Sequence, residues 1–171
     1  MNKYLKTENA SITVEYSNDI LVTLFKDSMV CNRGFQRLFI ECKASNLVDV
    51  YRELKKLIFN NITVFIKISD YDDKYLNIMN EVNKDFYTII CCDVKAFLNI
   101  KNNRDCFYEL KFKYTEKDKI IDIVNKYDNI LVHIDYNLSK LTNINAALDK
   151  IVAGVKSKEL NFSNLFMEKE L

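Results

Sequence analysis

A single histidine, His133, is the side chain in this sequence best suited to proton transfer. An unperturbed imidazole titrates near neutral pH, so it can act as an acid or a base under physiological conditions. Asp135 follows two residues later in an alternating segment, and residues two apart in a strand lie on the same face of a sheet. Asp135 is therefore predicted to orient the imidazole, which makes the two residues a candidate catalytic pair. The alternative is that His133 is an ordinary packed or surface residue.

Acidic residues follow two other predicted strands. Asp70 comes directly after the apolar segment 62–68, and Asp93 follows segment 86–91. Ligands collect at the carboxyl ends of parallel strands, and Mg²⁺ prefers oxygen ligands. Asp70 and Asp93 are therefore candidate magnesium ligands. The leading hypothesis is instead that Asp70 caps a helix, Asp93 serves a turn and the protein uses no cofactor, and magnesium binding is the alternative.

The five cysteines are predicted to be structural. They do not form a C-x-x-C pair, and the C-x-x-x-C-x-x-C motif with which radical-SAM enzymes hold their cluster is absent. Cysteine in an apolar strand behaves as a small hydrophobic residue. A single histidine also argues against a typical catalytic zinc site. The positions are Cys31, Cys42, Cys91, Cys92 and Cys106.

Glycine is scarce, and this excludes several classes of enzyme. The sequence contains two glycines, Gly34 and Gly154, and no proline. A Walker A loop and a dinucleotide-binding loop each need several glycines, so neither can be present. The G-x-S-x-G turn of α/β-hydrolases is also missing. A low glycine content together with abundant Asn, Lys and Ile is equally typical of an AT-rich genome.

Charge and hydropathy indicate the cellular location of the protein and which classes of partner it is unsuited to bind. The 171 residues include 25 basic and 24 acidic residues, giving a net charge of +1. This balance provides no electrostatic basis for binding nucleic acid or an anionic membrane. The apolar runs are too short to span a bilayer, and the first residues lack an apolar leader segment. We therefore expect a cytoplasmic protein with reduced thiols.

Residues 35–69 predict a strand–helix–strand unit. Segments 37–42 and 62–68 are apolar strands, and residues 46–59 show helical periodicity, with Ser45 at the N-cap position. Such a unit joins two parallel strands by a right-handed crossover. Further strands are predicted at 86–91, 106–114 and 130–136, each close to an amphipathic helix. Segments 11–16 and 20–25, separated by a turn signal, predict an N-terminal β-hairpin.

These elements predict one α/β domain over residues 1–171. We expect a mixed, partly parallel sheet of about six or seven strands, with three or four helices mainly on one face. The helices each carry one apolar stripe, whereas Glu41, Lys67 and Glu109 interrupt their strands on single faces. The second face of the sheet is therefore predicted to be partly polar. It is solvated, packs against a partner, or lines a partial βα-barrel, which is the alternative architecture.

The last segment, 161–171, is a candidate docking tail. Phe162, Leu165 and Phe166 have the spacing of one helical face, which suits either a partner protein or closure of the core. Because strong catalytic motifs are missing, the leading hypothesis is a non-enzymatic interaction or accessory protein in a homo- or hetero-oligomeric complex. The alternative is a small metal-dependent enzyme with its site at the carboxyl ends of the strands. A nucleic-acid-binding module is a third hypothesis, against which the charge balance argues.

Overall fold

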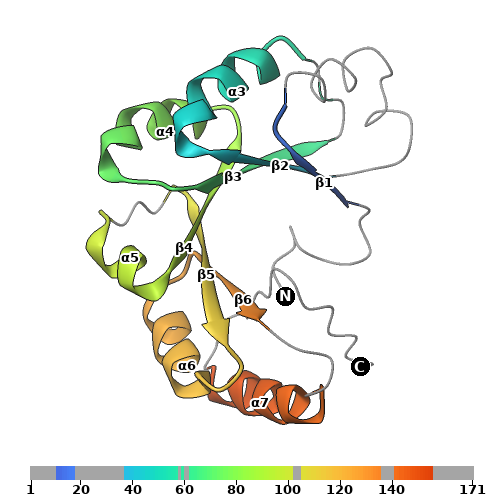
Figure 1. Ribbon diagram of the computed structural model, residues 1–171, viewed down its shortest axis with the longest axis vertical. Helices are drawn as coiled ribbons and strands as arrows, with labels where there is room; N and C mark the ends of the chain where they lie inside the picture. The colour runs from blue at the N-terminus through green and yellow to red at the C-terminus, as the bar shows by residue number, and fades with distance from the viewer. Residues whose placement is uncertain are drawn as a thin grey trace.

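Six parallel strands form one curved sheet, and their order in space follows their order in the sequence (Figure 1). The structure, a computed structural model, describes residues 11–17, 37–57, 59, 62–101, 105–135 and 141–155. The strands are β1 (Ser11–Glu15), β2 (Arg37–Lys43), β3 (Thr63–Ser69), β4 (Tyr87–Asp93), β5 (Phe107–Lys113) and β6 (Ile130–Asp135). The sheet rolls into an arc, which is the arrangement of a partial βα-barrel.

The helices lie along the outer, convex side of this arc (Figure 1). They are α3 (Leu47–Leu54), α4 (Leu76–Val82), α5 (Val94–Asn99), α6 (Lys117–Lys126) and α7 (Leu141–Gly154). Short 3₁₀ turns, η1 (Ala44–Asn46) and η2 (Asp73–Tyr75), precede α3 and α4. Right-handed crossovers that always step to the next strand in the same direction place every helix on the same face. The prediction of helices on one face is confirmed.

The main core lies between the helices and the convex face. Even-numbered residues of β2 and β3, such as Ile40 and Ile66, are fully buried there. Helix α3 contributes Leu47, Val50 and Leu54 to the same core, since these positions recur at helical spacing. Each βα unit therefore buries one strand face and one helix stripe.

Several local predictions need correction. The sheet is parallel throughout the described residues rather than mixed, because β1 pairs parallel with β2. The predicted second hairpin strand, 20–25, lies outside the described residues. Five helices are present in the described parts of the chain instead of three or four, since α5, with six residues, is too short to show a clear periodicity. Helix α3 ends at Leu54, and Ser45 lies inside η1 without capping it.

The concave face begins with an apolar layer near the amino-terminal ends of the strands. Its buried members are Phe39, Phe65, Ile89 and Leu131. The rings of Phe39 and Phe65 stack with centroids 4.9 Å apart, and Phe65 stacks on Tyr87 at 5.2 Å. Stacked aromatic rings on neighbouring strands stabilise a sheet by cross-strand packing. This layer fills the bottom of the concave face.

A stagger between strands brings polar residues into one layer above these rings. Lys67 is opposite Ile89 in the strand register, and Glu109 is opposite Leu131. Cys91 therefore lies two residues beyond the position opposite Lys67, and His133 lies two residues beyond the position opposite Glu109, which is the stagger found in the wall of a barrel. The offset brings Lys67 of β3, Cys91 of β4 and Glu109 of β5 to one level.

Among the described residues, no helix combines the length and apolar character needed to cross a membrane.

Replacing Phe65 tests whether the concave apolar layer is a second core. Phe65→Ala is expected to lower the free energy of unfolding by about 3–5 kcal/mol, because the ring is 2% exposed and stacked on both sides. Leu98→Ala on α5, where the side chain is 60% exposed, is the control and should change stability by less than about 0.5 kcal/mol. Denaturant unfolding measures both values, and equal effects would contradict the existence of this layer.

Candidate functional site in the concave face

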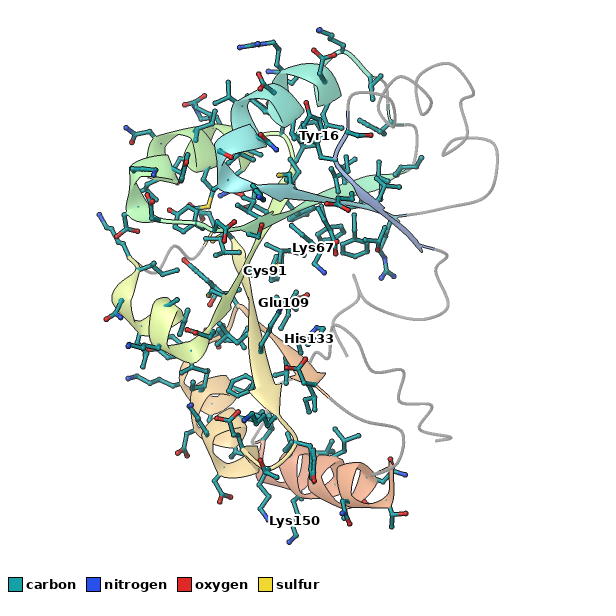
Figure 2. All side chains as sticks on the ribbon, viewed as in Figure 1. Tyr16, Lys67, Cys91, Glu109, His133 and Lys150 are labelled. Carbon is teal, nitrogen blue, oxygen red and sulfur yellow. The ribbon has the colours of Figure 1, made fainter. Side chains whose placement is uncertain are left out.

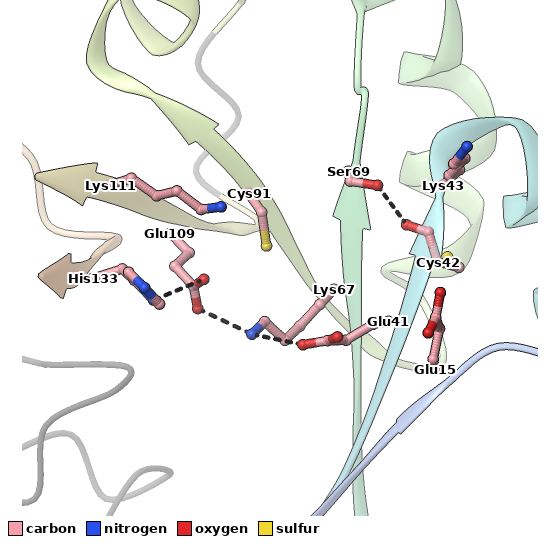
Figure 3. A pocket seen from close by; sticks show the side chains of 10 residues that line it. All are labelled: Glu15, Glu41, Cys42, Lys43, Lys67, Ser69, Cys91, Glu109, Lys111 and His133. Carbon is pink, nitrogen blue, oxygen red and sulfur yellow. Dashed lines mark hydrogen bonds and ion pairs between the residues drawn. The ribbon is translucent and has the colours of Figure 1, made fainter. Parts of the chain in front are cut away.

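A pocket of about 330 Å³ opens on the concave face towards the carboxyl ends of the strands (Figure 3). Charged side chains from β1, β2, β3 and β5, and the imidazole from β6, line it. The lining residues are Glu15, Glu41, Cys42, Lys43, Lys67, Ser69, Cys91, Glu109, Lys111 and His133. Figure 2 shows Lys67, Glu109 and His133 on the inner side of the arc, whereas Lys150 lies on the outer side.

A continuous chain of charged groups crosses the pocket. Lys67 Nζ donates to Glu41 Oε1 at 3.2 Å and lies 3.3 Å from Glu109 Oε2. The other oxygen of Glu109 lies 3.6 Å from His133 Nδ1, and Asp135 Oδ1 lies 3.5 Å from His133 Nε2. The chain links four strands, from β2 to β6 with the exception of β4. Glu109 is its centre, because it contacts both Lys67 and His133.

Glu109 is the most deeply buried member of this row of charged groups. Its side chain is 5% exposed, and that of Lys67 is 19% exposed. Removing a carboxylate and an ammonium group from water costs several kcal/mol for each ion, and their mutual attraction offsets this cost only when the geometry is good. Each oxygen of Glu109 faces a different partner. The Glu109 carboxylate is thus held between a group from β3 and a group from β6.

The environment changes the pKa of Lys67. Burial lowers it, but the neighbouring Glu109, Cys91 and Glu41 raise it, and the net result is a pKa above the ordinary 10.5. A lysine with a raised pKa in the folded state contributes stability that is complete below the unfolded pKa. This contribution is lost as pH rises through the folded value. The ion pairs of Lys67 are therefore intact across the neutral range.

Cys91 lies beside the charged groups but is a poor nucleophile. Burial, together with the nearby Glu109 carboxylate, raises the pKa of its thiol to about 12. A thiol becomes nucleophilic only as the thiolate. Cys42, Cys92 and Cys106 also have raised pKa values because they are buried. All four thiols are free in the structure, and those of Cys42 and Cys106 are buried.

The structure brings the predicted pair His133 and Asp135 together. Their contact is the one expected across the pleat, with the imidazole 27% exposed in the pocket wall. Sequence reasoning did not assign Glu109 and Lys67 to the site, although it placed them on the polar face. Their signal was a charged residue inside an otherwise apolar strand, which predicts a face but not a contact.

The predicted magnesium ligands are not brought together in the same way. The Asp93 carboxylate accepts a hydrogen bond from the Ala96 N–H at 2.7 Å and caps α5. Asp70 is exposed at the end of β3 in the left-handed backbone region, with φ of 53°. Asp72, rather than Asp70, caps the next helical turn, by accepting from the Lys74 N–H. Among the described residues, no group of three His, Cys, Asp or Glu side chains is arranged to hold a metal ion.

The third predicted site, the tail residues Phe162, Leu165 and Phe166, lies outside the described residues.

Comparison of the chain with family models, with curated proteins and with solved structures found no match. The pocket combines charges of both signs with an imidazole. It can bind polar groups, through charges of both signs, and it can move a proton, through His133.

Removing Lys67 tests whether the buried charges depend on each other. Lys67→Met is expected to cost about 3 kcal/mol of stability, because it leaves Glu109 buried without its ammonium partner. The double variant Lys67→Met/Glu109→Leu should recover most of this loss. The control Lys84→Met removes an exposed pair with Glu81 and should cost less than about 1 kcal/mol. Chemical denaturation measures the free energy of unfolding of each variant in this double-mutant cycle. If Lys67→Met were as stable as the control Lys84→Met, the two buried charges would not depend on each other.

Alkylation of Cys91 tests its environment. With a pKa near 12 against an ordinary value of 9.0, the folded chain should hold about 10³-fold less Cys91 thiolate at pH 8 than the denatured chain. Mass spectrometry of iodoacetamide-treated protein should show a correspondingly slow reaction. Glu109→Gln should speed it, since the Glu109 carboxylate contributes to the raised pKa. Equal rates in folded and denatured protein would show that the thiol is not shielded.

Proposed function

We propose that this chain binds a small polar molecule in the concave pocket, at the carboxyl ends of the parallel strands. The observation that carries the proposal is Glu109, a carboxylate that is 5% exposed and lies at the pocket between Lys67 and His133. Apolar residues of similar volume can usually replace a buried ion pair without loss of stability. The fold therefore does not require these charges, whereas a buried charge that lines a cavity is a candidate for ligand recognition.

The position and size of the pocket support the same proposal. Barrel proteins with parallel strands bind their ligands at the carboxyl ends of the strands, where the side chains of several strands converge. The volume of about 330 Å³ lies at the small end of the range for ligand pockets. The stacked aromatic layer beneath gives the polar residues a rigid support.

This proposal is compatible with a non-enzymatic accessory protein. A direct protein-docking role has less support in the described residues, where the exposed large apolar side chains are Val48, Tyr87 and Leu98. These three belong to α3, β4 and α5, so they come from three separate elements of the fold. The charges of the pocket are of both signs, which also gives no support to nucleic-acid binding.

An enzyme that transfers protons is the second candidate function. The observation that favours it is the position of His133, which has a carboxylate near each of its ring nitrogens. Carboxylates in this position fix the orientation of an imidazole. The chain would then act on the molecule that it binds. Magnesium dependence of such an enzyme stays a prediction. One oxygen of the candidate ligand Asp93 already accepts a hydrogen bond from the Ala96 N–H, which caps α5.

A pocket-filling variant tests the binding proposal. Ser69 lies at the pocket and is exposed, so Ser69→Trp should occupy the space without changing any charge. Ligand-observed NMR with a library of small polar metabolites should detect binding to the wild-type chain and at least ten-fold weaker binding to this variant. Asn77→Trp, at an exposed position of α4, is the matched control and should bind as the wild type does.

The same spectra distinguish the two candidate functions. Bound molecules that are recovered unchanged support a binding protein. Conversion of a bound molecule that stops in His133→Gln supports proton transfer. A library without hits, or hits that bind Ser69→Trp as tightly as the wild type, would overturn the proposal for this pocket.

A further inference from the structure

Two carboxylates lie on one side of the pocket, and Lys111 offers a positive charge on the other side, which points to the class of ligand. We propose that the pocket takes a small zwitterion, with its ammonium group at Glu15 and Glu41 and its carboxylate at Lys111. This inference rests on the proposed binding function and adds to it the chemical identity of the ligand. The following observations carry it.

Two carboxylates lie next to each other on one side of the pocket. Glu15 of β1 and Glu41 of β2 are directly opposite in the strand register, and both line the pocket. Like charges in this position repel each other. Glu41 shares the single ammonium group of Lys67 with Glu109, and Glu15 has no ion pair with any described residue. Among the described residues, Lys67 is therefore the one cation that forms an ion pair with the carboxylates on this side of the pocket.

Lys43, the next inward residue of β2, does not neutralise these carboxylates. It makes no ion pair with a described residue, although it lines the pocket. Figure 3 shows its ammonium group on the far side of Cys42 from Glu15. A positively charged group of a ligand at Glu15 and Glu41 would supply the missing partner.

The opposite side of the pocket offers a positive charge. Lys111 of β5 lines the pocket and makes no ion pair within the described parts of the chain. Figure 3 shows its side chain extending towards Cys91, over the pocket. His133 is its neighbour in the strand register and can add a hydrogen-bond donor. An anionic group of a ligand fits this side.

The Lys67–Glu109 pair lies between the two sides. Each of these groups already has a partner of opposite charge, so the middle of the pocket does not demand a charge from the ligand. Strands β2 and β5 are three strand spacings apart, about 14 Å along the sheet, and the curvature of the sheet shortens the direct path. A flexible molecule with an ammonium group at one end and a carboxylate at the other matches this layout by charge complementarity.

Three compounds of equal length test the inference. ε-Aminocaproate carries both charges, whereas hexylamine and caproate each carry one. Isothermal titration calorimetry should give an affinity for ε-aminocaproate roughly ten-fold or more above that of either single-charge compound, which corresponds to about 1.4 kcal/mol. Glycine and γ-aminobutyrate, which have shorter spacers, should bind more weakly.

Variants assign each end of the ligand to its side of the pocket. Lys111→Met should reduce the affinity for ε-aminocaproate to that for hexylamine. Glu15→Gln, which breaks no ion pair of the described residues, should reduce it to that for caproate. Lys95→Met, at an exposed position of α5, is the control and should leave all affinities unchanged.

The outcomes separate this inference from the binding function on which it rests. Equal binding of the three compounds, or tighter binding of hexylamine or caproate, would overturn the zwitterion inference and leave the binding function intact. Hits from the metabolite library without any binding of ε-aminocaproate would do the same. If neither the library nor these compounds bind, the binding function itself is wrong.

Discussion

The ammonium group of Lys67 lies between two carboxylates that come from different strands, 3.2 Å from Glu41 and 3.3 Å from Glu109. Glu41 is on the adjacent strand, but Glu109 is two strands away, about 10 Å along a flat sheet. The contact is possible because the sheet curves and the lysine is long. The concave pocket depends on the same curvature. This interaction therefore depends on the curvature of the whole sheet as well as on the charges of the residues in contact.

The two faces of this sheet differ in what packs against them. On the convex face, alternate strand residues pack under the helices and form the main core. On the concave face, an aromatic layer containing Phe39 and Phe65 fills the bottom, and the charged layer lies above it. Burial of apolar side chains on both faces holds the strands together. The charged layer can therefore vary in chemistry while the fold is maintained by its neighbours.

The burial of Glu109 has a cost that the fold alone does not explain. Two partners, Lys67 and His133, are positioned to offset this cost, one at each carboxylate oxygen. Such preorganised charges interact strongly with a ligand, because they need little rearrangement when it binds. The proposed recognition of a zwitterion places the ligand's own charges on the two sides of the pocket that lack partners. The Lys67–Glu109 pair then forms the polar middle of the pocket, between the two ends of the ligand.

Periodicity in the sequence was sufficient to predict the α/β class, the helices on one face and the partly polar second face. It also placed His133 and Asp135 together, since residues two apart in a strand share a face. The sheet was predicted to be mixed, with β1 in an N-terminal hairpin, whereas the described strands are all parallel. Parallel strands normally have both faces covered and lose their alternation. Here the helices of the described residues all cover the convex face, so the alternation survives and resembles that of an antiparallel strand.

The tertiary structure decided which charged residues meet. The sequence showed Glu41, Lys67 and Glu109 on single faces of three strands, but the contact between Lys67 and Glu109 depends on the stagger of two residues between β3 and β4 and on the curvature of the sheet. Stagger and curvature arise from the packing of all the strands and helices together. A local pattern determines towards which face a side chain points. Only the assembled sheet determines what that side chain touches.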